Sequence, residues 1–488
     1  MVGQTGRSGH TESACYERDL TDVTLVNVAL PSIQDDLGFS TSSLAWVVNA
    51  YLIAFGGLLL LAGRFGDLVG RRRVFLAGLG VFTLASLLCG TAQNEGLLIG
   101  ARFLQGVGGA MTSSVILGII VTMFSEPREQ ARALGVYGFV ASAGGAVGLL
   151  AGGVLTQSIS WHWIFFVNVP IGVLTAALAL RLLDADKGTG FGRGADSLGA
   201  ALITGALMLG VYTIVKPAAE YGWGAGRTLE FGATSVALLA AFVLRQATAR
   251  NPLIPLRIFR SRNVTGANLI QALTVVGMFG MFFLGALYLQ RVLGYDALQI
   301  GLAFLPVAII MGLVSLRYSE RLIMRLGARR TLLPGLLLIA AGLVLFAQAP
   351  VGGAYLIHIL PAMLLLGTGI GVAFPALITL AMSGATPSDA GLASGVVNTT
   401  VQVGGALGLA VLATLSASRS ANLVSQGRPE AAALTSGYHL AFWIGAGLAV
   451  AALVVALTVL RPGAPAAPQP PAGDQVAEPV AVGARRSV

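Results

Sequence analysis

Long apolar stretches separated by short polar segments run through almost the whole chain of 488 residues. A helix needs about 20 mostly apolar residues to cross the hydrocarbon core of a bilayer. The pattern predicts fourteen membrane-spanning helices and hence an all-α polytopic membrane protein. They lie near residues 20–33, 43–62, 74–92, 97–122, 133–156, 162–183, 198–215, 229–244, 264–290, 297–316, 331–348, 355–381, 393–416 and 439–460.

The composition agrees with this prediction. Hydrophobic residues make up 55% of the chain and charged residues 10%, whereas about 25% of the residues of an ordinary soluble protein are charged. The net charge of +9 does not indicate a nucleic-acid partner, because the basic residues are scattered between apolar stretches. The lipid bilayer is therefore the expected environment of the chain.

The basic residues also predict the orientation of the helices. Of the 30 Lys and Arg residues, 24 lie on the side of the membrane that holds both termini and 5 lie on the other side, while Arg102 falls inside a span. Positive charge is retained on the cytoplasmic side. Both termini are therefore expected in the cytoplasm.

The first predicted span is the weakest. It begins beside Asp19 and Asp22, and only Val23 to Ile33 form a clean apolar run. Charged residues such as Glu17 and Arg18 should not enter hydrocarbon without partners. We expect that this helix is truncated, or that the natural protein starts with more apolar residues.

Weak internal similarity divides the chain into two halves. Gly144 to Leu149 recur as Gly404 to Leu409, with an offset of 260 residues, and the residues after Gly70 recur loosely after Gly327, with an offset of 257. Parallel repeats of this kind are typical of transporters. The repeat predicts a six-helix bundle (20–183) and a second six-helix bundle (264–460), separated by a linker with two inserted helices (184–263). The polar start of the chain and its Pro- and Ala-rich end predict a polar tail (1–19) and a disordered cytoplasmic tail (461–488).

Three motifs carry candidate chemistry. The loop predicted after the second span contains glycines that permit a tight turn, an acid and a run of arginines: Gly63, Asp67, Gly70, Arg71 and Arg72. On its own this could be a basic anchor at the lipid headgroups. The spacing G-x-x-x-D-x-x-G-R-R is more specific than an anchor requires.

The other two motifs lie inside spans. Arg102 has Gln105 three residues further on the same helix face; snorkelling of Arg102 to the nearer membrane face is the alternative to a role in a cavity. In the fifth span, glycines form a face that lets another helix approach closely: Gly144, Gly148, Gly152 and Gly153. Ordinary helix packing explains part of this second pattern.

Together these motifs resemble those of the major facilitator superfamily. Four further stretches, residues 22–31, 46–51, 161–170 and 391–405, resemble the 14-spanner drug:proton antiporters of the EmrB/QacA type. The resemblance covers about residues 22 to 460, although Leu149 stands where the antiporter motif usually has proline. It implies the major facilitator fold with two six-helix bundles and two inserted helices, in the cytoplasmic membrane of a bacterium.

The resemblance also implies a function, which is proton-coupled export of small amphipathic molecules by alternating access. Its arginine motif links Arg102 to proton transfer, and Asp22 is the main acid expected at membrane depth. Burial raises the pKa of a carboxyl group, although a truncated span could leave Asp22 at the water interface. Polar side chains in apolar spans are candidates for lining the substrate cavity: Asn27, Asn49, Gln105, Asn268, Gln271, Asn398 and Gln402. Some of these side chains are expected to join helices instead.

Other classes of function find little support. No nucleophile–base pair or metal-binding cluster is visible in the sequence. The chain has two lysines, Lys187 and Lys216, and neither lies in a Walker A motif. We therefore expect no enzyme, no metal and no cofactor, and a monomer, although the sequence leaves the oligomeric state open. An uptake permease of the same fold and a non-transporting protein with a damaged first span are the alternatives.

Overall fold

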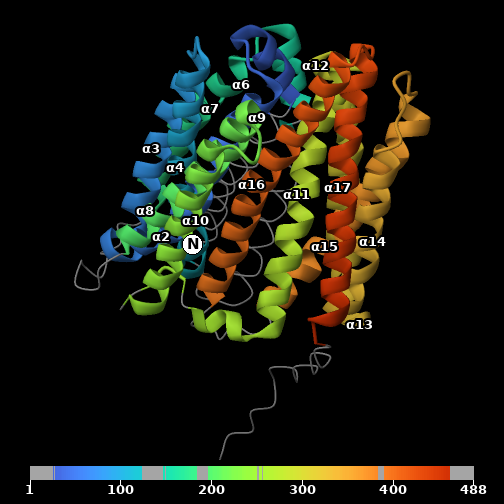
Figure 1. Ribbon diagram of the computed structural model, residues 1–488. Helices are drawn as coiled ribbons and strands as arrows, with labels where there is room; N and C mark the ends of the chain where they lie inside the picture. Colours follow the sequence, from blue (N-terminus) through green and yellow to red (C-terminus); the bar gives the residue numbers. More distant parts are fainter. Residues whose placement is uncertain are drawn as a thin grey trace, which may run out of the picture.

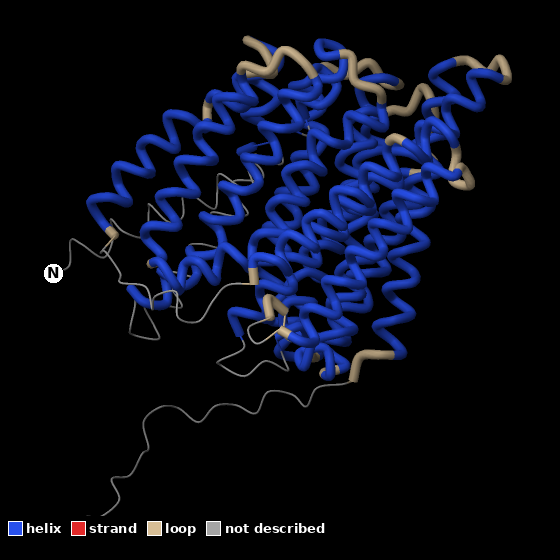
Figure 2. The backbone as a smooth tube through the Cα atoms, turned by 60° about the vertical axis from the view of Figure 1, so that its left-hand side comes forward, coloured by secondary structure: helices blue, strands red, loops and turns tan. Residues whose placement is uncertain are grey.

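The computed structural model describes residues 26, 28–123, 147–148, 150–183, 196–249, 252–254, 256–382 and 390–461. All regular structure within these ranges is helical. The long helices run roughly parallel, with the N-terminal half of the chain on the left of Figure 1 and the C-terminal half on the right. The rotated view in Figure 2 shows the same arrangement of long, aligned helices.

The N-terminal half begins with the helical residues 28–37. Its further helices are α2 (Thr41–Val69), α3 (Arg71–Gly90), α4 (Glu95–Met123), α6 (Trp163–Phe166) and α7 (Asn168–Leu182). Helices α2, α3 and α4 pack against one another, and α3 also packs against α7. The inserted segment follows as α8 (Ser197–Val215), α9 (Pro217–Tyr221) and α10 (Gly226–Thr248).

The C-terminal half is described more completely. It contains η2 (Leu256–Arg260), α11 (Arg262–Arg291), α12 (Ala297–Val314), η3 (Ser315–Ser319), α13 (Glu320–Leu326), α14 (Ala328–Phe346), η4 (Tyr355–Ile359), α15 (Leu360–Met382), α16 (Ala390–Ser425) and α17 (Glu430–Thr458). Helices α11, α14, α16 and α17 form one packed group, and α15 joins α12 to α14.

Eleven helices in the described ranges are long and apolar enough to cross a membrane. Half of the first predicted span and most of the fifth lie outside these ranges, so the structure leaves the prediction of fourteen spans unconfirmed. Several helices are longer than their apolar stretches. The tenth span continues through the π-helical turn η3 to Leu326, and α16 extends to Ser425.

The predicted loop after the second span is also mostly helical. Helix α2 continues through Gly63 and the backbone of Asp67 to Val69, and α3 begins at Arg71. Gly70 alone makes the turn, with φ of 111°, a conformation that residues with a Cβ rarely adopt. The equivalent Gly327 makes the same one-residue turn between α13 and α14, with φ of 81°.

Helix packing shows the internal repeat in three dimensions. A Cβ on Gly78 of α3 would lie 3.0 Å from the carbonyl oxygen of Gly108 on α4. A Cβ on Gly335 of α14 would lie 3.0 Å from the carbonyl oxygen of Gly369 on α15. The paired helices approach closely in both halves because glycine leaves room for the facing backbone.

The arginines that follow the two glycine turns also make equivalent contacts. Arg72 donates to the carbonyl oxygen of Leu180 near the end of α7, at 2.7 Å. Arg329 donates to the carbonyl oxygen of Leu457 near the end of α17, at 2.6 Å. Each guanidinium group satisfies a carbonyl at a helix C-terminus, where positive charge is favoured. The halves therefore share tertiary contacts as well as sequence.

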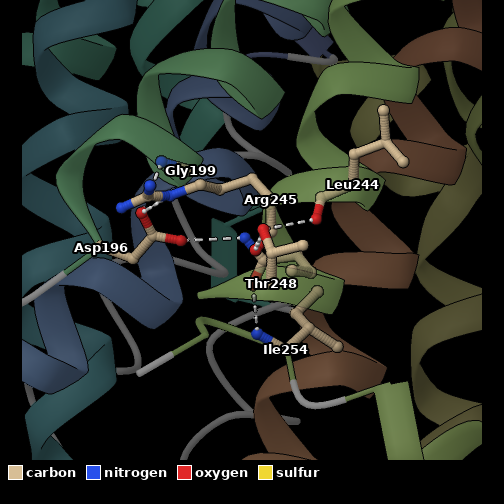
Figure 3. A network of polar contacts seen from close by, with 7 residues as sticks. Asp196, Gly199, Leu244, Arg245, Thr248 and Ile254 are labelled. Atoms are coloured by element: carbon tan, nitrogen blue, oxygen red, sulfur yellow. Dashed lines mark hydrogen bonds and ion pairs between the residues drawn. The ribbon is translucent and has the colours of Figure 1, made fainter. Parts of the chain in front are cut away.

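The inserted helices α8 and α10 pack against each other, and α8 also contacts α2 and α16. Asp196 caps α8 by accepting a hydrogen bond from the Gly199 N–H at 2.9 Å. The same carboxylate accepts from Arg245 and Gln246 of α10, each at 3.0 Å (Figure 3). Burial raises the pKa of Asp196, but these hydrogen bonds and the charge of Arg245 outweigh it and lower the pKa below 3.8. An ionised Asp196 therefore joins the two inserted helices at one end.

Candidate functional site

Arg102 lies on α4 with none of its surface exposed to solvent. Placing a charged side chain inside a membrane bundle is costly unless its polar atoms find partners. The Nε atom donates to the carbonyl oxygen of Val47 on α2 at 2.9 Å. The Nη1 atom donates to Oε1 of Gln105 at 2.6 Å. Arg102 therefore does not snorkel to the membrane surface.

Gln105 extends this contact into a chain of hydrogen bonds across three helices. Its Nε2 atom donates to the hydroxyl of Ser86 on α3 at 2.9 Å. The Ser86 hydroxyl donates in turn to the Phe82 carbonyl oxygen at 2.7 Å, and the side chains of Arg102, Gln105 and Ser86 are all buried. A buried hydrogen-bond network holds its members in fixed positions. The arginine is thus pre-positioned by α2, α3 and α4.

Two aromatic rings contact the guanidinium group. Its central carbon lies 4.6 Å from the ring centroid of Tyr51 and 5.8 Å from that of Phe165. Both distances lie in the range of a cation–π interaction. Tyr51 and Phe165 were not predicted as site residues, although both belong to the stretches 46–51 and 161–170 that carry the family resemblance.

The other predicted cavity residues fall into different environments. Asn49 is completely buried, and neither of its amide atoms has a hydrogen-bond partner among the residues that the structure describes. Asn268 is buried and accepts a hydrogen bond from Thr400 at 3.0 Å, so it joins α11 to α16. Gln271 is buried, whereas Asn398 is exposed and Gln402 is partly exposed. These residues are thus spread over both halves.

Glycine contacts join the two halves at two places. A Cβ on Gly56 of α2 would lie 2.8 Å from Cβ of Gln402 on α16. A Cβ on Gly153, in the fifth span, would lie 2.9 Å from the carbonyl oxygen of Ala297 and from Cα of Leu298 on α12. The repeat relates the second span to the tenth and the fifth to the thirteenth, so the two contacts are equivalent. Gly148, Gly152 and Gly153 of the predicted glycine face are buried.

Two polar contacts near the start of α2 were not predicted from the sequence. Trp161 donates from its indole nitrogen to Asp36 at 2.9 Å. Asp35 forms an ion pair with Arg291 at the end of α11, which connects the N-terminal half to the C-terminal half. Neither acid lies in an apolar run, so hydropathy gave no signal for these pairings.

Some predicted site residues lie outside the described part of the chain. They are Asp22, Asn27 and Gly144, together with the side chain of Asp67. Among the residues that are described, no group of three His, Cys, Asp or Glu side chains could hold a metal ion.

Two repeated groups of long apolar helices, the first of which contains a buried, hydrogen-bonded arginine, are typical of a polytopic membrane transporter. The family model described as the Major Facilitator Superfamily matches residues 19–409. The chain belongs to this superfamily, whose members are membrane-embedded transporters and not enzymes.

Relatives agree with this assignment, and a solved structure shares the fold. The chain is 41% identical to the puromycin resistance protein pur8 of Streptomyces alboniger over 440 residues, which cover 88% of this chain and 87% of that protein. It is 40% identical to the cephamycin export protein CmcT of Amycolatopsis lactamdurans over 476 residues, 95% of each chain. A crystal structure of a bacterial homologue of the human lysosomal transporter Spinster, inward-facing and unoccupied, matches with a TM-score of 0.68 at 16% identity. That match covers 96% of this chain and 100% of the other.

Proposed function

We propose that this protein is a proton-driven exporter of amphipathic small molecules, a 14-spanner antiporter of the EmrB/QacA type that works by alternating access. Relatives named for antibiotic resistance and export match most of the chain, which supports transporter-mediated efflux. The pair of inserted helices α8 and α10 between the two halves supports the fourteen-span type. We further propose that the protein acts as a monomer.

The observation that carries the proton coupling is the buried position of Arg102. Its hydrogen bonds to Val47 and Gln105 and its contacts with two aromatic rings hold a fixed positive charge inside the bundle. Such a charge stabilises a nearby carboxylate and so lowers its pKa. A positive charge in this position is suited to control the protonation of an acid in the same bundle.

We propose Asp22 as that acid. Burial raises the pKa of a carboxyl group, whereas a fixed positive charge close to it lowers the pKa. A conformational change that alters their separation would make Asp22 bind a proton in one state and release it in the other. The proton shifts the equilibrium between the two states only through this difference in affinity.

The contacts between the halves support alternating access. Gly56 and Gly153 allow close approach of the halves at two positions related by the repeat. The ion pair between Asp35 and Arg291 joins the ends of residues 28–37 and α11. In the proposed cycle the halves rock about the glycine contacts, and the ion pair opens when the substrate leaves.

The proposed orientation places both termini in the cytoplasm and the Asp35–Arg291 pair on the outside. Reporter fusions after Arg193 and after Arg461 should both report a cytoplasmic location in bacteria. A periplasmic signal at either position would contradict the orientation.

The proposed substrate class follows from the relatives and from the candidate cavity. Asn49 presents an amide whose hydrogen bonds a substrate could complete, because an unsatisfied buried amide is unfavourable. Puromycin and a cephamycin, the compounds in the relatives' names, are the first probes. Cells that lack their own exporters should survive higher concentrations of at least one drug in a susceptibility panel when they express this protein.

Energised cells distinguish export from the two alternatives. An exporter lowers the internal concentration of a fluorescent amphiphile when the membrane is energised, and an uptake permease raises it. If the internal concentration of the amphiphile does not change although the protein is normally inserted, the protein is a non-transporting membrane protein and the proposal is overturned.

A further inference from the structure

A basic cavity lies where α11 begins and the chain leaves α17. It has a volume of about 410 Å³ and is lined by Arg260, Ser261, Arg262, Asn263 and Arg461. Three of these five residues are arginines and none is acidic. The cavity is open to the surface, and its three arginine side chains are exposed. The cavity is far from Arg102 in the chain and is not part of the proposed transport mechanism.

Hydrogen bonds join the three segments that line the cavity, which are η2, the start of α11 and the residues after α17. The backbone N–H of Arg461 donates to Oδ1 of Asn263 at 3.0 Å, which attaches the end of the described chain to α11. The hydroxyl of Thr265 donates to the carbonyl oxygen of Phe259 at 2.7 Å, which attaches η2 to α11. The arginines therefore converge because the backbone segments that carry them are fixed.

The three guanidinium groups have no hydrogen bond or ion pair to any residue that the structure describes. Arg329, also at this end of the bundle, is different because its Nε and Nη2 atoms both donate to carbonyl oxygens near the end of α17. Like charges that share a cavity repel one another unless an anion lies between them. The start of the 30-residue helix α11 adds the positive end of a helix dipole at the same place.

The chemistry of the cavity favours a phosphate group. Arginine binds phosphate through two parallel N–H donors, which gives geometric specificity as well as charge. An inorganic phosphate and a phospholipid headgroup share this chemistry.

Exposed apolar side chains four to seven residues from the lining arginines in the chain favour the lipid. Leu269 is 46% exposed and lies seven residues after Arg262, two turns along the same face of α11. Leu457 on α17 is 50% exposed and lies four residues before Arg461. Acyl chains attached to a phosphate in the cavity could lie along these two leucines. Leu256 of η2, four residues before Arg260, is also 38% exposed.

We propose that this cavity binds the headgroup of an anionic phospholipid, with Arg260, Arg262 and Arg461 holding its phosphate. The proposed orientation places the site in the cytoplasmic leaflet, and only the choice of leaflet depends on that orientation. Binding does not require transport, so lipid binding can be tested independently of the proposed function.

Native mass spectrometry of the purified full-length protein tests the proposal. The probes are phosphatidylglycerol and phosphatidylcholine with identical acyl chains, and inorganic phosphate alone. A basic residue near an anionic lipid surface contributes about 1 kcal/mol, which corresponds to about fivefold in affinity. Arg260→Gln, Arg262→Gln and Arg461→Gln together should weaken phosphatidylglycerol binding about 100-fold and leave phosphatidylcholine binding unchanged.

Two matched variants separate a specific site from general charge. Replacement of the three arginines by lysine keeps the charge and loses the planar donor pair, so we expect an intermediate loss of affinity. Arg321, Arg325 and Arg330 are exposed on another part of the same end. Their replacement by glutamine removes the same charge and should leave phosphatidylglycerol binding unchanged.

Several results would overturn the proposal. These are equal binding of the two lipids, an equal loss in the control variant, or displacement of phosphatidylglycerol by inorganic phosphate at equal affinity. If the triple glutamine variant does not fold, Arg262→Gln alone should show about a fivefold loss. The absence of that loss in a folded protein would equally refute the site.

Discussion

Replacement of Arg102 separates a role in transport from a role in stability. Arg102→Ala removes the two charge-assisted hydrogen bonds to Val47 and Gln105, which costs about 1.5–3 kcal/mol for each, although the Gln105 oxygen keeps the thiol of Cys89 as a weaker donor. It also removes a buried charge, and this recovers several kcal/mol of desolvation energy. The two terms offset each other, so we expect the free energy of unfolding to change by no more than about 2 kcal/mol.

Transport should respond much more strongly. Without a fixed positive charge, nothing in this cluster shifts the pKa of a neighbouring acid, so Arg102→Ala should lose nearly all gradient-driven efflux. Arg102→Lys keeps the charge and one hydrogen bond. Loss of the other bond, at about 1.5–3 kcal/mol, predicts efflux reduced about 10- to 100-fold.

The assay combines thermal unfolding in detergent with efflux from proteoliposomes that contain equal amounts of folded protein. Arg321→Lys and Arg321→Ala, at an exposed position, are the matched controls and should behave as the wild type. Wild-type efflux by folded Arg102→Ala would refute the reasoning. A large loss of stability with normal efflux per folded molecule would show that Arg102 is only structural.

Three further predictions concern other contacts. Gly153→Ala should impair efflux because its Cβ would meet backbone atoms of α12 at 2.9 Å, whereas Gly447→Ala, with no atom within 4 Å, should not; normal efflux by both variants would contradict the packing argument. Asp196 has a lowered pKa, so its contribution to stability is fully present above pH 3.8 and is lost as the pH falls through its folded pKa; acid titration of unfolding should show this loss in the wild type and not in Asp196→Asn. Neutralising Asp35 or Arg291 alone should shift the distance distribution between spin-labelled halves modestly, because an exposed ion pair contributes only about 0.2–1 kcal/mol. Exchanging the two charges should restore the wild-type distribution, as measured by electron spin resonance. A shift in the exchanged variant equal to that of the single variants would argue against pairing.

Hydropathy predicted most helices because each long span needs an apolar face toward lipid. Their ends were less predictable. Helix α2 continues past its apolar stretch to Val69, and only the positive φ of Gly70 ends it. Similarly, Arg317 was expected in a loop but lies in the π-helical turn η3. Polar residues at a membrane surface are compatible with both helix and loop, so a hydropathy pattern does not locate these ends.

The site was predictable in part. The pairing of Arg102 with Gln105 follows from their spacing of three residues on one helix, and the structure contains it. The contacts of Arg102 with Val47, Tyr51 and Phe165 join residues that are distant in sequence. Such contacts depend on how α2, α4 and α6 pack, and no local pattern in the chain specifies that packing.

The most direct test of proton-coupled export is efflux from proteoliposomes under an imposed pH gradient, with wild-type protein and Asp22→Asn compared. The probe is whichever compound the susceptibility panel identifies. The asparagine variant cannot exchange a proton at this position, so it should bind the compound with nearly normal affinity and show no efflux driven by the gradient. Full gradient-driven efflux by Asp22→Asn would contradict the account, because Asp22 would then not be the coupling acid.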